Sequence, residues 1–171
     1  MPGYFLDTSV WVAWYFDEHP HHTQAADLLE ARSASDAAWL CRATEQSWLR
    51  LATTAAVCRA FASPVLTNVH ARAVLATWHA RPHVRRLDAE PEGTRVLWLE
   101  LAAIPSASPK VWMDAYLAAF SIRAGLPFAT LDADFRRFEA VGLQLNLLIP
   151  VVHRRSTGGP RKSGTTAVEK S

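Results

Sequence analysis

Acidic residues stand beside apolar segments at several widely separated points of this chain, and together they suggest a metal site. They are Asp7, Glu45, Asp114, Asp132 and Asp134. Carboxylates that lie close together repel one another, and they stay ionised only when a cation sits among them. Oxygen ligands without His or Cys favour Mg²⁺ or Mn²⁺ over zinc. Because bound Mg²⁺ lowers the pKa of water and stabilises a leaving oxygen, the sequence favours a metal-dependent phosphodiesterase.

Each acid also has a structural explanation that needs no metal. Glu45 would suit the first turn of a helix, where the helix dipole favours a negative charge. Asp132 or Asp134 could cap a short helix. Asp7 and Asp114 are harder to explain in this way, because they stand in apolar surroundings and neither is obviously matched by a nearby Lys or Arg.

The acids can meet only if the fold brings their segments together, and the hydrophobic pattern predicts such a fold. Short apolar runs predict strands over 3–6, 37–41, 128–131 and 143–148, and the alternating segment 84–88 predicts another. Strands that alternate with helices are typical of an α/β fold, with a mostly parallel sheet of four or five strands and helices on both faces. Such sheets place ligands outside the carboxyl ends of their strands, which is where Asp7 and Asp132 stand.

Residues that start and stop helices set the bounds of the segments between these strands. Thr8 or Ser9 can cap the first helix, and Thr44 can cap another that runs to about residue 60. The Ser-Pro pair at 108–109 can open a helix that Gly125 ends. The expected helices span 8–16, 21–32, 44–60, 68–79, 92–103 and 109–124.

Three stretches of the sequence resemble the motifs of the PIN-domain family, and in particular those of the VapC ribonuclease toxins of bacterial toxin–antitoxin pairs. The segment "FLDTSVWVAWYFDEHPHH" is similar to the first motif, in which an Asp at a strand end precedes Ser, Thr or Asn and an apolar helix. "CRATEQSWLRLAT" is similar to the second motif, and "MDAYLAAFSIRAGLPFATLDADF" to the third and fourth together. The resemblance extends from Tyr4 to about Ile149 and implies a three-layer PIN-like domain over 1–150.

The resemblance also implies a role for each acid. Asp7, Glu45, Asp114 and Asp132 match the acidic quartet of the family and are the expected catalytic residues. Asp7 and Asp114 are expected to bind Mg²⁺ directly, with Mn²⁺ as a substitute. Glu45 and Asp132 would complete the site directly or through water, and Asp134 is an alternative ligand.

Neighbouring polar residues are expected to orient these acids. Thr8 or Ser9 would hold Asp7, and Thr130 would hold the acid of the fourth motif or a bound water. Met113 departs from the pattern, because many relatives carry a polar Thr at this position.

An activity and partners follow from the same resemblance. It implies an endoribonuclease that hydrolyses RNA with metal-activated water and leaves a 5′-phosphate and a 3′-hydroxyl. It also implies a homodimer, and a VapB-like antitoxin whose C-terminal segment enters the active-site groove. Two rival interpretations stay open: a non-catalytic PIN-like module that binds RNA or a protein, and a phosphatase with Asp7 as nucleophile. The phosphatase motif would need an acid where Ser9 stands.

Four further residues are candidates for contacts with RNA or with the antitoxin. Arg42 could meet a phosphate or an acidic residue, as could Arg136 and Arg137, with solvated surface as the alternative. Trp112, close to Asp114 in the sequence, is the best candidate for stacking on a base.

Composition fits one cytoplasmic domain followed by a tail. The 171 residues contain no apolar run near the about 20 residues of a transmembrane helix, no signal-peptide pattern, and two cysteines, too few for a disulfide framework. Five of the 18 basic residues but one of the 16 acids fall in 153–171, so the remainder is net negative although the whole chain carries +2. The basic, Gly- and Ser-rich segment 151–171 is expected to be disordered, and either aids solubility or contacts phosphates.

Overall fold

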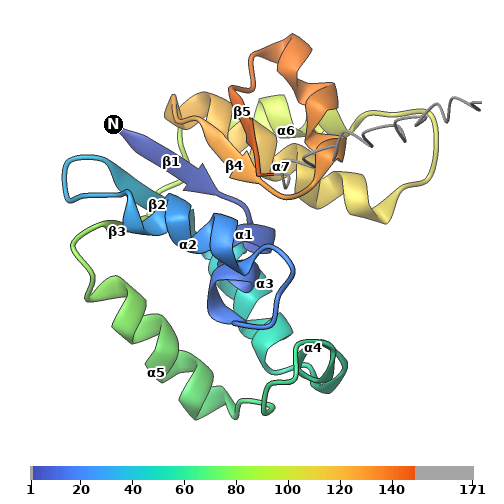
Figure 1. Ribbon diagram of the computed structural model, residues 1–171. Coiled ribbons are helices and arrows are strands. Elements are labelled where there is room, and N and C mark those ends of the chain that lie inside the picture. The colour runs from blue at the N-terminus through green and yellow to red at the C-terminus, as the bar shows by residue number, and fades with distance from the viewer. Residues whose placement is uncertain (1, 149–171) are drawn as a thin grey trace, which may run out of the picture.

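A parallel β-sheet forms the centre of the molecule (Figure 1). The computed structural model describes residues 2–148, so the expected tail at 151–171 lies outside the described residues. Within 2–148 five strands follow the order β3-β2-β1-β4-β5, and each neighbouring pair is parallel. They are β1 (Gly3–Leu6), β2 (Ala37–Cys41), β3 (Val84–Leu87), β4 (Phe128–Thr130) and β5 (Leu145–Leu147). The predicted α/β fold is confirmed.

Helices cover both faces of this sheet. Successive side chains of a strand point to opposite faces, so Leu6 and Leu40 lie in one apolar cluster while Phe5 and Phe128 lie in another. The first cluster is covered by α1 (Thr8–Tyr15), α2 (His22–Glu30), α3 (Arg42–Ala52) and α5 (Asn68–His79). The second is covered by α6 (Thr94–Ala102), α7 (Pro109–Ala124) and the 3₁₀ helix η1 (Ala133–Val141).

Two predicted helix caps lie inside their helices rather than before them. Asp7 takes the N-cap position of α1, so Thr8 and Ser9 fall in its first turn. Cys41 takes the N-cap position of α3, and the Thr44 hydroxyl accepts the Cys41 backbone N–H at 3.0 Å. Each helix thus begins at the end of its strand, which places Asp7 at the N-cap of α1 and Glu45 in the first turn of α3 close to the sheet.

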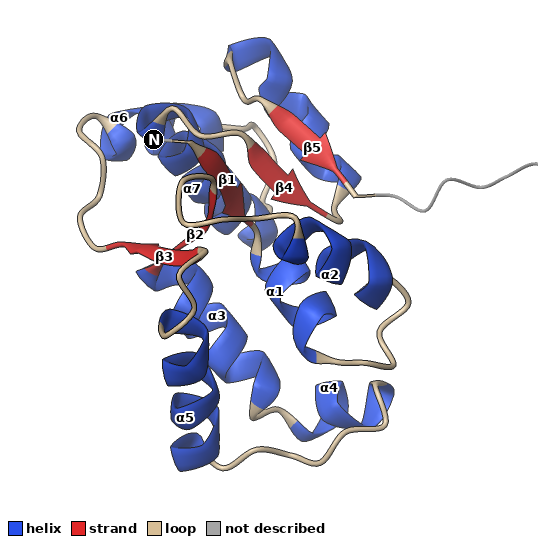
Figure 2. Cartoon of the chain, turned by 60° about the vertical axis from the view of Figure 1, so that its left-hand side comes forward, coloured by secondary structure: helices blue, strands red, loops and turns tan. Residues whose placement is uncertain are grey.

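The predicted long helix over 44–60 is broken in two. Thr53 and Thr54 donate their hydroxyls to the carbonyls of Leu49 and Arg50 at 2.8 and 2.6 Å. Threonine hydroxyls that bond to the backbone in this way compete with continued helix. α3 therefore ends at Ala52, and a short helix, α4 (Ala55–Ala60), follows in a new direction (Figure 2).

An aromatic cluster attaches α5 to the rest of the molecule. The Trp78 ring of α5 lies 5.3 Å from the Trp11 ring and 4.4 Å from the Trp48 ring, measured between centroids. All three side chains are buried, and Figure 2 shows α5 alongside α3 on the side away from β4 and β5. No helix within residues 2–148 has the length and apolar character needed to cross a membrane.

Candidate active site

The carboxyl ends of the neighbouring strands β1 and β4 bring the segments of two predicted acids together. Leu6 pairs with Ala129, and the Asp7 N–H donates to the Ala129 carbonyl at 2.9 Å. Asp7 therefore follows β1 beside Thr130, the last residue of β4, and Asp132 lies two residues further along the chain.

Asp7 is a buried carboxylate that neutral donors hold in place. It is 8% exposed, and its Oδ2 accepts from the Ser9 hydroxyl at 2.6 Å and from the Thr130 hydroxyl at 2.7 Å. Burial raises the pKa of Asp7, and these hydroxyl donors oppose the rise. Within the described residues no Lys or Arg forms an ion pair with Asp7. Of the two predicted orienting residues, Ser9 rather than Thr8 supplies the bond.

Asp114 is buried on α7, but the expectation that no Lys or Arg matches it is wrong. Lys110 Nζ lies 3.8 Å and Arg137 Nη2 lies 3.4 Å from Asp114 Oδ2. Burial raises the pKa of Asp114 to about 6, although both cations act against the rise. The sequence did contain a signal for Lys110, because a residue four positions before an acid on a helix lies on the same face.

Asp132 and Asp134 share the ammonium group of Lys110. Its Nζ lies 2.6 Å from Asp132 Oδ2 and 2.7 Å from Asp134 Oδ2. Asp132 also caps η1, since its Oδ1 accepts the Asp134 N–H at 2.9 Å, and Thr130 Oγ1 accepts the Asp132 N–H at 3.0 Å. Burial alone would raise the pKa of Asp132, but Lys110 and the backbone donor bring it below its ordinary value. The capping alternative is therefore correct for Asp132.

Glu45 is buried in the first turn of α3 and has its own basic partners. His79 Nε2 lies 2.7 Å from Glu45 Oε1, and Arg86 Nη1 lies 3.7 Å from Oε2. His79 ends α5 and Arg86 lies on β3, so neither is near Glu45 in the sequence. In the described part of the chain, contacts at Glu45 thus link it to α5 and β3 rather than to the aspartates.

The predicted acids, all of which the structure describes, lie near the carboxyl ends of the strands, but they are not grouped closely enough to form a set of metal ligands. Within residues 2–148 no three His, Cys, Asp or Glu side chains are grouped so that they could hold a metal ion. The chemistry of Asp7 and Asp114 nonetheless fits a divalent cation, because both are buried oxygen donors whose pKa values are raised by burial. A cation between them would offset the cost of burying their charges.

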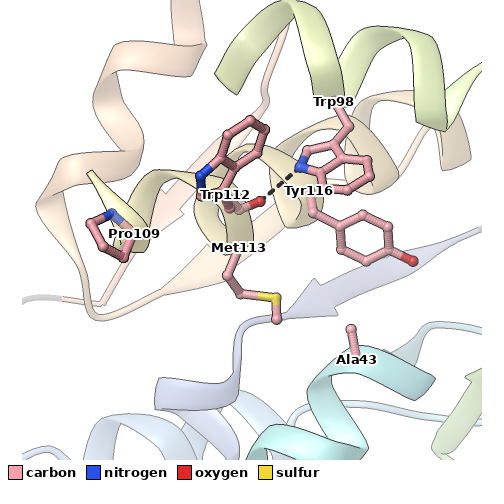
Figure 3. Close-up of a pocket in the computed structure, with 6 residues that line it drawn as sticks. All are labelled: Ala43, Trp98, Pro109, Trp112, Met113 and Tyr116. Carbon is pink, nitrogen blue, oxygen red and sulfur yellow. Dashed lines mark hydrogen bonds between the residues drawn. The ribbon is translucent and has the colours of Figure 1, made fainter. Parts of the chain in front are cut away.

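Trp112 lines an apolar pocket (Figure 3). The pocket has a volume of about 400 Å³ and lies between α7, α6 and Ala43 of α3. Trp112 is 51% exposed, and its carbonyl accepts the Trp98 indole N–H at 2.8 Å. Figure 3 shows Met113 extending toward Ala43. Residues two apart on a helix do not face each other, so the exposed Trp112 ring belongs to the pocket rather than to Asp114, and its stacking on a base stays a prediction.

The three candidate arginines have different surroundings. The four aspartates near the carboxyl ends of the strands, which we call the acidic edge, are Asp7, Asp114, Asp132 and Asp134. Arg137 contacts Asp114 and so belongs to this edge. Arg42, the first residue of α3, is exposed next to Ala43 of the apolar pocket. Arg136 is exposed as well, and neither Arg42 nor Arg136 forms an ion pair within residues 2–148.

The sequence matches a known family along most of its length. The model of the PIN domain matches residues 4–141. The chain belongs to the PIN domain family. This PIN domain is similar to Ribonuclease VapC41 of Mycobacterium tuberculosis, in strains CDC 1551 / Oshkosh and ATCC 25618 / H37Rv. This chain and VapC41 of either strain are 39% identical over 139 residues, which is 81% of this chain and 95% of VapC41. The predicted kinship with VapC-type PIN domains is confirmed.

Solved VapC structures share the fold of this PIN domain. Mycobacterium tuberculosis VapC20, a sarcin–ricin loop cleaving toxin, superposes with a TM-score of 0.55 at 20% identity and covers 82% of this chain and 96% of its own. VapBC-1 from nontypeable Haemophilus influenzae gives 0.54 at 13% identity, covering 85% and 97%. VapBC2 from Rickettsia felis, bound to a DNA fragment from its promoter, superposes with a TM-score of 0.51 at 13% identity. The match covers 84% of this chain and 97% of the Rickettsia chain.

Proposed function

We propose that this PIN domain is a Mg²⁺-dependent endoribonuclease and the toxin of a VapBC-type pair. The observation that carries the proposal is the pair of buried carboxylates, Asp7 and Asp114, at the carboxyl edge of a parallel sheet. The similarity to Ribonuclease VapC41 supports RNA as the substrate.

The site residues have distinct tasks in this proposal. Asp7 and Asp114 would hold Mg²⁺ directly, and the other acids would reach it directly or through water. Bound Mg²⁺ supplies an acidified water and stabilises negative charge on the scissile phosphate. Ser9 and Thr130 hold Oδ2 of Asp7, which orients the carboxylate.

Positive groups beside the acids would help to admit RNA. Lys110 and Arg137 lie within 4 Å of Asp114, so they reduce the net negative charge that an RNA phosphate meets. The exposed Trp112 ring lines the apolar pocket, and exposed Arg42 is next in sequence to Ala43 of that pocket, so these side chains would contact a base and the RNA backbone there.

Replacement of Asp7 tests the enzymatic part of the proposal. Purified protein should cleave RNA with Mg²⁺ and stop with EDTA. Asp7→Asn should lower the rate more than about a hundredfold, because an amide is a poor ligand for Mg²⁺, while circular dichroism shows an intact fold. Asp27→Asn, an exposed change on α2, is the matched control and should remain active. Full activity of Asp7→Asn would show that the site is assigned wrongly.

A VapB-like antitoxin and a second copy of the chain are the proposed partners. The similarity to solved VapBC complexes from Haemophilus influenzae and Rickettsia felis supports the first. Co-expression with the protein encoded beside this chain should yield a complex that no longer cleaves RNA. Size-exclusion chromatography with light scattering should show that the chain alone is a dimer. We expect the dimer and the antitoxin complex to be in the cytoplasm.

A non-catalytic binding module is the second candidate function. It is favoured by the lack, within residues 2–148, of a compact group of three possible ligands. Calorimetry that detects RNA binding but no Mg²⁺ or Mn²⁺ binding would support it against the nuclease.

A further inference from the structure

Lys110 is placed to act as a built-in counter-ion of the acidic edge. It lies in the first turn of α7, just after Pro109, and its ammonium contacts carboxylates from outside that helix as well as Asp114 on it. The distances to Asp132 and Asp134 are 2.6 and 2.7 Å, within hydrogen-bond range of both. An ammonium group has three donors, so this arrangement commits most of them to aspartates.

The two ends of the acidic edge are neutralised differently. At one end Asp7 is held by uncharged donors, among them the hydroxyls of Ser9 and Thr130, and no Lys or Arg within residues 2–148 pairs with it. At the other end Lys110 bonds Oδ2 of both Asp132 and Asp134. A metal ion at this second end would have to displace the ammonium from those same oxygens.

The net charge of the acidic edge matches that of one divalent cation. Four aspartates bring four negative charges when ionised, and Lys110 and Arg137 bring two positive charges. Glu45 is left out of this count, because its contacts are with His79 and with Arg86, which also pairs with Asp88, and not with the aspartates or their cations. The remainder, two negative charges, is what a single divalent ion neutralises. Without Lys110 the remainder would be three.

We propose that Lys110 occupies the Asp132–Asp134 end of the edge, so that the site takes one divalent cation, at the Asp7–Asp114 end, and not two. The proposal rests on the metal-dependent function proposed above. It makes Lys110 a positioning residue that determines the metal content of this PIN domain.

Counting bound Mn²⁺ on the full chain tests this role without reference to cleavage. Isothermal titration calorimetry and the electron paramagnetic resonance signal of free Mn²⁺ would both give the number of ions bound per chain. The wild type should bind one ion. Lys110→Met, which keeps the stem and removes the charge, should bind a second ion at millimolar Mn²⁺. Adding Asp134→Asn to Lys110→Met should abolish the second ion, since that ion needs both carboxylates.

Two control variants separate the specific role of Lys110 from a general effect of charge. Lys110→Arg keeps a cation and should still bind one ion. Arg136→Met removes a positive charge from exposed surface nearby and should also leave one. Thermal unfolding in EDTA adds a second measurement: Lys110→Met should melt earlier than wild type, and Mn²⁺ should restore most of the loss.

Each outcome supports or overturns a defined part of the proposal. Two ions on the wild type, or one on Lys110→Met with unchanged affinity, would overturn the role of Lys110 while leaving the nuclease intact. Unchanged Mn²⁺ binding with weakened RNA binding in Lys110→Met would also overturn it, and would assign Lys110 to the phosphate. No Mn²⁺ on any variant would instead contradict the metal-dependent function itself.

Discussion

At the scale of single residues, we expect Asp114 to couple the proposed metal binding to pH. Burial raises its pKa to about 6 from the ordinary 3.8, so protons compete with a metal for this carboxylate in mildly acidic solution. The folded, metal-free protein binds more protons than the unfolded chain between these two values. The contribution of Asp114 to the free energy of unfolding is therefore present below about 4 and is lost as the pH rises through about 6.

We predict that Mn²⁺ affinity falls about tenfold per pH unit below about 6 and changes little from this cause above it. Calorimetry from pH 5 to pH 8 would measure the dependence. Asp114→Asn should bind Mn²⁺ weakly at every pH, without the step near 6. A wild-type affinity that stays constant down to pH 5 would contradict the prediction.

The acids of the edge could be predicted from the sequence, whereas most of their partners could not. Asp7, Asp114 and Asp132 belong to motifs in which an apolar strand or helix positions the acid. His79 and Arg86 reach Glu45 from segments more than 30 residues away, and no local pattern predicts such contacts.

At the scale of elements, Gly3 controls the pairing of β1 with β2. Its φ is +120°, in the left-handed region that favours glycine, and an added Cβ would collide with the backbone carbonyl of Ala37. Gly3 pairs with Ala37 in the sheet, and β1 carries Asp7 directly after its last residue. A clash here would therefore be felt at the acidic edge.

We predict that Gly3→Ala lowers the free energy of unfolding by more than about 3 kcal/mol, because backbone strain and a backbone clash add. Gly142→Ala is the matched control, since Gly142 has a φ of +101° but open space around its Cα. It should cost about 1 kcal/mol in the same urea titration. Equal losses in the two variants would show that the β1–β2 contact is not the cause.

The strands were easier to predict than the helix ends. Apolar runs mark buried strands directly, and the predicted bounds of β1 and β2 agree with the structure. The break after α3 depends on Thr53 and Thr54 turning their hydroxyls back to carbonyls. That choice between side-chain bonding and continued helix is not visible in the hydrophobic pattern.

At the scale of the whole molecule, the strand order was beyond local reading of the sequence. β1 lies between β2 and β4, and its partner β4 comes more than 120 residues later in the chain. The hydrophobic pattern identifies strands but not their neighbours. The alternation of strands and helices predicted a parallel sheet covered on both faces, and the family resemblance implied the PIN-like form of that arrangement.

We predict that a chain of residues 1–150 keeps the fold and the cleavage activity within about twofold, because segment 151–171 lacks the apolar residues of a core. Thermal unfolding and a cleavage assay at two salt concentrations would test this. If the truncated chain instead cut RNA far more slowly, with a weaker dependence on salt, the basic segment would be a phosphate-binding arm.

The central position of β1 has a consequence for synthesis. Asp7 is translated 123 residues before Thr130, whose hydroxyl donates to the Asp7 carboxylate at 2.7 Å. A nascent chain folds from its N-terminus as it emerges from the ribosome, so β1 must wait for β4 before the edge is assembled. The acidic edge therefore cannot assemble until β4 has left the ribosome, and a nascent chain that ends before β4 lacks the Thr130 contact to Asp7.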